Sequence, residues 1–132
     1  MGEHERDSGA EFPKYGHVYE ADLDPVIGAE IGKSRPALIV SNDLNNRYSQ
    51  TVTIMPITGQ PAKKAYPFEV ILPKGTAGLA VDSRMKADQI RTVDKKRLHG
   101  FRGTVPRRFF PAIEKAMKVH LNMRDGPWTT TT

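Results

Sequence analysis

The sequence contains no cysteine, which excludes disulfide bonds, thiolate metal sites and a thiol nucleophile. It also contains no apolar run near the ~18–20 residues that span a bilayer, so we expect no membrane segment. The N-terminal residues lack the apolar core of a secretory signal, so we expect no signal peptide. His4, His99 and His120 stand far apart, without the spacing of metal ligands. These absences are consistent with a cytoplasmic protein that uses neither a metal ion nor another cofactor.

Positive charge is concentrated in one half of the chain, although the net charge of the 132 residues is only +5. From residue 84 onward, twelve basic residues stand against four acidic ones. The first residues of the chain are acidic instead. A basic half indicates an anionic partner, most often a nucleic acid. On charge alone, a solvated surface that serves only solubility is an equally good interpretation.

Two short apolar runs organise the middle of the chain, at residues 37–40 and 52–57. Each is rich in β-branched or large apolar residues and is bounded by polar or turn residues, a pattern typical of buried strands. Arg35 stands just before the first run, and Thr58 closes the second. If the two strands are antiparallel neighbours, the start of one lies beside the end of the other. Arg35 and Thr58 are then predicted to meet at one rim of a sheet.

Several further elements are predicted from local patterns. Strands are predicted at residues 16–23, 66–73 and 99–105, and residues 79–92 supply one long bent strand or two short ones. Residues 42–48 have the capping chemistry of a short helix or turn. Pro56 indicates an edge position or a bulge in its strand. Five to seven short strands with one terminal helix predict a mainly-β fold, a small and strongly bent barrel.

Apolar residues return with a helical period near the C-terminus. This face consists of Phe109, Ile113, Ala116, Met117, His120 and Leu121. Phe109, Ile113 and Met117 are predicted to lie in the core. Pro111 fits if the helix starts near Phe110 with the proline at its first position.

The chain is short enough for one domain, which we place at residues 14–124. Residues 1–13 are polar and without periodicity, which indicates a disordered tail or an expression remnant. Residues 125–132 are predicted to be a frayed C-terminus.

Several short motifs resemble the MazF/PemK family of bacterial toxins, the ribonuclease half of toxin–antitoxin pairs. The motifs are GHVYEADLDPVIGAE at 16–30, RPALIVSND at 35–43, PIT at 56–58, YPFEV at 66–70 and ADQIRTVDK at 87–95. The likeness spans roughly residues 15–122 in the right order. It implies an SH3-like barrel, a homodimer, and metal-independent cleavage of single-stranded RNA that leaves a 2′,3′-cyclic phosphate and a 5′-hydroxyl. It also implies a cognate antitoxin, whose acidic and partly disordered segment would fold on binding.

The resemblance assigns roles to individual residues. The catalytic arginine of the family falls on Arg35, and its catalytic threonine falls on Thr58. Some members are described with a basic residue and an aspartate two apart, and those positions hold Lys86 and Asp88. Glu30 matches a position lining the same groove, and we include it with these two as supporting residues. An arginine keeps its charge, so we expect Arg35 to clamp the phosphate, or to act as a general acid, rather than to act as a base.

Further residues are predicted to bind RNA. Gln89 and Arg91 match motif positions that line the groove. Lys33, Lys63 and Lys64 are predicted to contact the RNA, the last two as salt-dependent phosphate contacts on a loop. The sequence leaves the general base open.

The sequence departs from the family pattern at three positions. His17 replaces an acid, Ala29 replaces a serine or histidine, and Ile31 replaces a glutamine. These departures concern base recognition and proton transfer, for which Asp88, Glu30 and His17 are the candidate bases. Two other functions stay open, a toxin of the same fold that inhibits a protein such as DNA gyrase, and a non-catalytic RNA-binding module.

Overall fold

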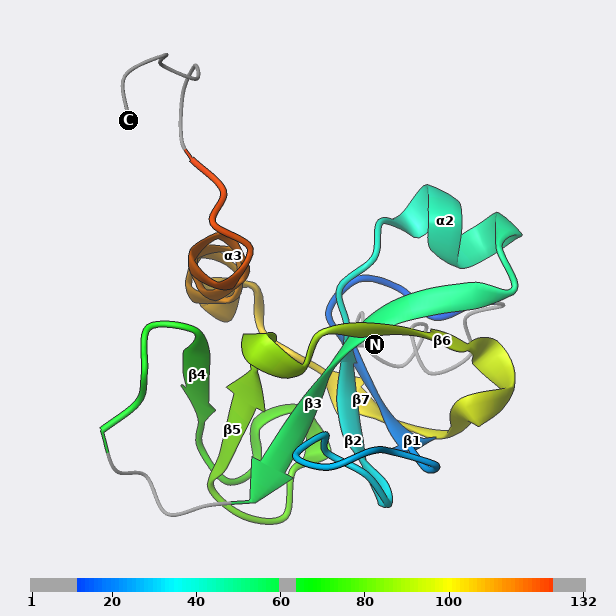
Figure 1. The fold of residues 1–132 in the computed structure, drawn as a ribbon, viewed down its shortest axis with the longest axis horizontal. Coiled ribbons are helices and arrows are strands. Elements are labelled where there is room, and N and C mark those ends of the chain that lie inside the picture. The colour runs from blue at the N-terminus through cyan, green and yellow to red at the C-terminus, as the bar shows by residue number, and fades with distance from the viewer. Residues whose placement is uncertain (1–11, 60–63, 125–132) are drawn as a thin grey trace, which may run out of the picture.

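A computed structural model describes residues 12–59 and 64–124, and these form a mainly-β fold with a C-terminal helix (Figure 1). The strands are β1 (His17–Asp22), β2 (Ser34–Ile39), β3 (Thr51–Gly59), β4 (Glu69–Leu72), β5 (Ser83–Lys86), β6 (Arg91–Asp94) and β7 (Leu98–Thr104). The α-helices are α2 (Asp43–Tyr48) and α3 (Phe110–His120). Four short 3-10 helices join them: η1 (Thr76–Gly78), η2 (Ala87–Gln89), η3 (Lys95–Arg97) and η4 (Arg107–Phe109). The predicted fold class is confirmed.

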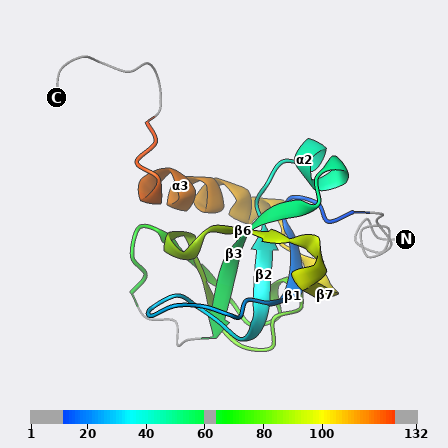
Figure 2. The ribbon, with the colours of Figure 1, turned by 45° about the vertical axis from the view of Figure 1, so that its right-hand side comes forward.

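The strands form one antiparallel sheet in the order β4-β5-β3-β2-β1-β7, and β6 also pairs with β3. Strand β3 is the centre of this sheet, because it pairs with β2, with β5 and with β6. The two ends of the sheet approach each other through η1, where Arg102 Nη2 of β7 donates to the Gly78 carbonyl oxygen at 3.1 Å. The result is a strongly bent sheet, with α3 lying across one side of it (Figure 2).

Apolar residues fill both faces of the sheet. Leu38 and Met55 belong to one buried cluster, while their strand neighbours Ile39 and Ile54 belong to another. Because adjacent residues of a strand point to opposite faces, the two clusters lie on opposite faces of the sheet. Helix α3 covers the first cluster through Ile113 and Ala116. The second cluster is covered in part by Ile31, from the loop between β1 and β2.

The structure resolves two predictions about strands, one for residues 79–92 and one for Pro56. Residues 79–92 form two short strands joined by η2, the second of the two predicted alternatives. The expected edge position or bulge at Pro56 is wrong, because β3 is central and Pro56 pairs with Ala37 of β2. On β3, the ladder to β6 ends at Ile54 and the ladder to β5 begins at Ile57. A residue without an N–H is therefore accommodated between two ladders in the middle of a sheet.

Helix α3 begins at Phe110, as predicted, and the proline is at the second position of the helix rather than the first. Ile113 is fully buried, and Phe109 and Met117 pack against the same cluster while remaining partly exposed. The predicted apolar face is wrong at its end, because His120 and Leu121 are exposed. The packing surface under α3 ends before the last turn of the helix, so the periodicity of the sequence runs further than the core.

Candidate active site

Thr58 lies near the end of β3 and is almost completely buried, with 7% of its surface exposed. Its Oγ1 atom has no hydrogen-bond partner among residues 12–59 and 64–124. Most buried side-chain hydroxyls are hydrogen-bonded, and leaving one unpaired costs about 1–3 kcal/mol. Within the described residues, the hydroxyl proton of Thr58 is therefore available to a group bound at this end of β3.

Arg35 lies on the same face of the sheet as Thr58 and at the same end. The ladder between β2 and β3 ends at the pair Ala37–Pro56. Arg35 and Thr58 each come two residues beyond this pair, and residues two apart on a strand share a face. The Arg35 Nε atom donates to the Gly32 carbonyl oxygen at 2.9 Å, which holds the side chain on the loop before β2. The antiparallel pairing of the two strands, on which the predicted meeting of Arg35 and Thr58 depended, is therefore present.

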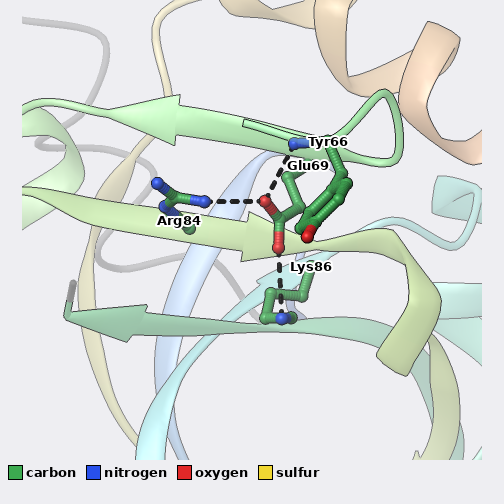
Figure 3. Close-up of polar contacts among 4 residues, drawn as sticks. All are labelled: Tyr66, Glu69, Arg84 and Lys86. Atoms are coloured by element: carbon green, nitrogen blue, oxygen red, sulfur yellow. Dashed lines mark hydrogen bonds and ion pairs between the residues drawn. The ribbon is translucent and has the colours of Figure 1, made fainter. Parts of the chain in front are cut away.

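On the other side of Thr58 lies a cluster of charged residues on β4 and β5. Arg84 is the direct cross-strand partner of Thr58, and its Nη1 donates to Glu69 Oε1 at 2.9 Å. Lys86 Nζ lies 3.1 Å from the other carboxylate oxygen of Glu69. The same Oε1 atom accepts the backbone N–H of Tyr66 at 3.1 Å. Figure 3 shows the carboxylate between the two cationic side chains.

Glu69 is ionised in this cluster although its side chain is only 2% exposed. Burial raises the pKa of the Glu69 carboxyl, but the Tyr66 amide together with Lys86 and Arg84 lowers it by more, so the pKa lies below its ordinary value. The cluster thus combines two cationic side chains with one carboxylate, directly beside Thr58.

The loop between β1 and β2 is anchored by residues that were predicted to serve the RNA. The Gln89 Oε1 atom accepts the Ile31 N–H at 3.1 Å, and Arg91 Nη1 donates to the Leu23 carbonyl oxygen at 3.1 Å. Glu30 Oε1 accepts the Ile27 N–H at 2.8 Å within the loop. Gln89, Arg91 and Glu30 therefore each have a structural role in placing the loop next to Arg35.

A model of the PemK-like, MazF-like toxins of type II toxin–antitoxin systems matches residues 14–121. The chain belongs to this family. It is 37% identical over 113 residues to endoribonuclease MazF9 of Mycobacterium tuberculosis, a match that covers 82% of this chain and 95% of that relative. It is also 37% identical over 112 residues to endoribonuclease EndoA of Bacillus subtilis, covering 85% of this chain and 97% of the relative. The family suggested by the sequence motifs is thus confirmed.

The fold agrees with this membership. A solved structure titled as an endoribonuclease in complex with its cognate antitoxin, from a mycobacterial species, superposes with a TM-score of 0.70 at 26% sequence identity. That match covers 89% of this chain and 99% of the other chain. The similarity therefore extends over almost the whole of the relative.

Other predicted site residues of this MazF-like toxin lie in different surroundings. Lys33 is exposed and has a positive φ of 66°, at the end of the loop before β2. Lys64 is exposed, whereas Lys63 lies outside the described residues. Asp88 is in η2, with Oδ1 buried and unpartnered in the part of the chain that the structure describes. Lys86 pairs with Glu69 rather than with Asp88.

His17 is at the wrong end of β1 to act on a phosphate near Arg35. It is 1% exposed, and its Nδ1 accepts the Lys14 N–H at 3.1 Å. Arg35 pairs with Ala21, four residues further along the strand, which corresponds to about 13 Å. Of the candidate bases, Asp88 and Glu30 remain.

Glu69 and Arg84 are members of the site that were not predicted from the sequence. A signal was present, because Arg84 and Lys86 alternate with Ser83 and Met85 and so place two cations on one face of a short strand. Glu69, the first residue of the preceding strand β4, is the acidic residue available to that face. Recognising the cluster required the register of β4 and β5.

Among residues 12–59 and 64–124, no group of three or more histidine, aspartate or glutamate side chains is arranged to hold a metal ion. In the same ranges, no helix has the length and apolar character needed to cross a membrane.

Proposed function

We propose that this chain is an endoribonuclease toxin that cleaves single-stranded RNA at selected sequences without a metal ion. The observation that carries the proposal is the buried Thr58 hydroxyl, unpartnered among the described residues, on the same face and at the same end of the sheet as Arg35. The relatives MazF9 and EndoA, both named endoribonucleases, support the same activity.

The proposed reaction needs no protein nucleophile, because RNA carries its own. The 2′-hydroxyl oxygen attacks the adjacent phosphorus, and the bond from phosphorus to the 5′-oxygen breaks. The products are a 2′,3′-cyclic phosphate and a 5′-hydroxyl, whose oxygen takes its proton from water. Arg35 clamps the phosphate through its guanidinium, which stays charged throughout. Thr58 donates a hydrogen bond from its hydroxyl to a non-bridging oxygen as negative charge develops there.

A general base must accept the proton of the 2′-hydroxyl. We assign this role to Asp88 or Glu30, which lie on η2 and on the loop before β2. The rate constant of cleavage should fall in Asp88→Asn or in Glu30→Gln, and only the variant at the base should lose the acid limb of the pH–rate profile.

We further propose a homodimer that is neutralised by a cognate antitoxin. An acidic and partly disordered antitoxin segment would fold onto the basic surface. The net charge of +5 supports an acidic partner, and a similar endoribonuclease has been solved with its own antitoxin. Because messenger RNA is the proposed substrate, we place the activity in the cytoplasm. Light scattering on the purified protein should give twice the mass of one chain, and the mass of a single chain would contradict the dimer.

The activity is tested by incubating the protein with a mixed RNA pool in the presence of EDTA. The wild-type protein should give discrete fragments whose 5′ ends carry a hydroxyl. Arg35→Ala should cleave at least about 100-fold more slowly, as expected for loss of a group that stabilises the transition state. Arg107→Ala removes the same charge from an exposed position of η4 and should cleave like the wild type.

Intact RNA in this assay, combined with a second measurement, would assign the chain to another function. Intact RNA together with retained RNA binding would assign the chain to the RNA-binding modules. Intact RNA together with blocked DNA supercoiling would assign it to the toxins that inhibit DNA gyrase.

A further inference from the structure

Thr58 stands between two arginine-bearing strands, and only one of these arginines is explained by the proposed reaction. Arg35 lies on β2, on one side of Thr58, while Arg84 lies directly opposite Thr58 on β5. Arg84 and Lys86 are two residues apart, so both project from the face that carries Thr58. When the pairing of β3 with β5 is continued by one residue from Ile57–Met85, Lys86 comes opposite Pro56. Arg84 and Lys86 therefore line the β5 side of the site, which we call its second wall, and Arg35 lies on the opposite β2 side.

We propose that Glu69 is a positioning residue that fixes Arg84 and Lys86 as a cationic wall beside the phosphate bound at Thr58. This inference rests on the proposed ribonuclease function. It assigns the contact with the RNA backbone to Lys86, whose side chain is 21% exposed, and a supporting electrostatic role to Arg84, whose side chain is 9% exposed. Glu69 itself, at 2% exposure, acts only through these two side chains.

Charge balance explains why a carboxylate is needed at this place. Two cations on neighbouring positions of one strand face repel each other, and the flexible lysine would turn toward water without an anion to hold it. Glu69 uses one oxygen for each cation, at 2.9 and 3.1 Å. Arg84, Lys86 and Glu69 together carry one net positive charge, which favours a phosphate beside them.

The carboxylate is in turn fixed by the backbone. The Tyr66 N–H donates to Glu69 Oε1, and this bond ties the turn before β4 to the cluster. Glu69 also lies on β4 opposite Lys86 in the strand register. A carboxylate held by a backbone N–H and by its own strand can orient a lysine, whereas a freely rotating surface glutamate cannot.

The alternative is an ion-pair cluster that stabilises the β4–β5 hairpin and has no part in cleavage. The two roles differ in the kinetic constants that they affect. Glu69→Gln adds one net positive charge beside the phosphate, so electrostatic attraction alone predicts tighter RNA binding. Loss of positioning predicts a lower kcat in the same variant. A purely structural role predicts an unchanged kcat for the folded fraction of the protein, with any change confined to KM.

The test is a double-mutant cycle on RNA cleavage with Glu69→Gln, Lys86→Met and both together. We expect kcat to fall about tenfold in Glu69→Gln without an increase in KM, a coupling within the range for residues in contact. The kcat of Lys86→Met should fall at least as far. The double variant should lose less than the product of the two single losses, because Glu69 acts in part through the lysine. Lys86→Arg keeps the charge and the contact, and should retain most of the wild-type kcat.

A matched control is the ion pair between Glu20 and Arg102, at 2.8 Å on the neighbouring strands β1 and β7. Glu20→Gln should leave kcat and KM unchanged. If Glu69→Gln does not fold, Lys86→Met and Lys86→Arg still test whether the positioned charge of Lys86 is needed for kcat, because Glu69 keeps its contact with Arg84 in both variants.

Three results would overturn the positioning role: additive effects in the cycle, a wild-type kcat in Lys86→Met, or a change confined to KM. The proposed ribonuclease function fails in a different way, namely when the wild-type protein leaves RNA intact or when Arg35→Ala cleaves like the wild type. The two failures are therefore distinguishable in one set of assays.

Discussion

Replacing Thr58 with valine should make this protein more stable and less active. Valine has nearly the same shape as threonine, with a methyl group in place of the hydroxyl. The hydroxyl of Thr58 is buried and lacks a hydrogen-bond partner within the described ranges, and such a group costs about 1–3 kcal/mol in the folded state. Taking the lower end, we expect Thr58→Val to raise the free energy of unfolding by about 1 kcal/mol, or the melting temperature by about 3–5 °C.

The same change removes the proposed donor to the phosphate oxygen. Loss of one donor of this kind lowers kcat by about 100- to 1,000-fold. Opposite signs for stability and activity are expected where a polar group is retained for function at a cost in stability. Thermal unfolding measures the first quantity, and single-turnover cleavage of an RNA oligonucleotide measures the second.

A matched control exists on β7. The Thr104 Oγ1 atom is also buried without a partner among residues 12–59 and 64–124, but it lies at the His17 end of β1. Thr104→Val should raise the stability by a similar amount and leave kcat unchanged. The reasoning is refuted if Thr58→Val cleaves RNA like the wild type, or if it lowers the melting temperature while Thr104→Val raises it.

Three further predictions concern stability. The lowered pKa of Glu69 stabilises the folded state, and this stabilisation is fully present above the ordinary glutamate pKa of about 4.3. It is lost as the pH falls through the lower pKa of the folded state. Glu69→Gln should therefore flatten the dependence of the melting temperature on pH in that acid range. Gly78→Ala should lower the free energy of unfolding by more than about 1–2 kcal/mol, because φ is +74° and the new Cβ would lie 2.3 Å from the Arg102 carbonyl oxygen. At Gly100, a new Cβ would meet nothing within 4 Å, so Gly100→Ala should be nearly neutral. Urea unfolding measures both variants. Ile113→Ala, at a fully buried position of α3, should cost about 2–5 kcal/mol in the same urea titration.

Local patterns predicted the elements of this fold better than their pairing. The apolar runs at residues 37–40 and 52–57 lie in or next to β2 and β3, and Pro111 indicated the start of α3. These features depend on residues close together in the sequence, where the preferences of side chains act directly on the backbone. The meeting of Arg35 and Thr58 at one end of the sheet could also be predicted, because it needs only that two successive strands run antiparallel.

The cluster around Glu69 depends on information that local patterns do not contain. Its contact with Arg84 joins residues 15 positions apart across a hairpin. The connection between the two strands contains η1 and three residues with positive φ, at Gly75, Ala77 and Gly78. The register of the hairpin therefore follows from an irregular turn, and a shift of one residue would move both cations to the opposite face.

Motif positions alone do not separate a residue that contacts the substrate from one that holds the backbone beside it. Gln89 and Arg91 both bond to backbone atoms in or next to the loop before β2, and the bond from Ile31 to Gln89 joins residues 58 positions apart. That loop also supplies the Gly32 carbonyl oxygen that accepts from Arg35. A substitution at Gln89 or Arg91 can therefore reach the phosphate through the loop and Arg35, without any lost contact to RNA. Thr58 and Arg84 lie instead on paired strands, so the second wall of the site keeps its position when the loop moves.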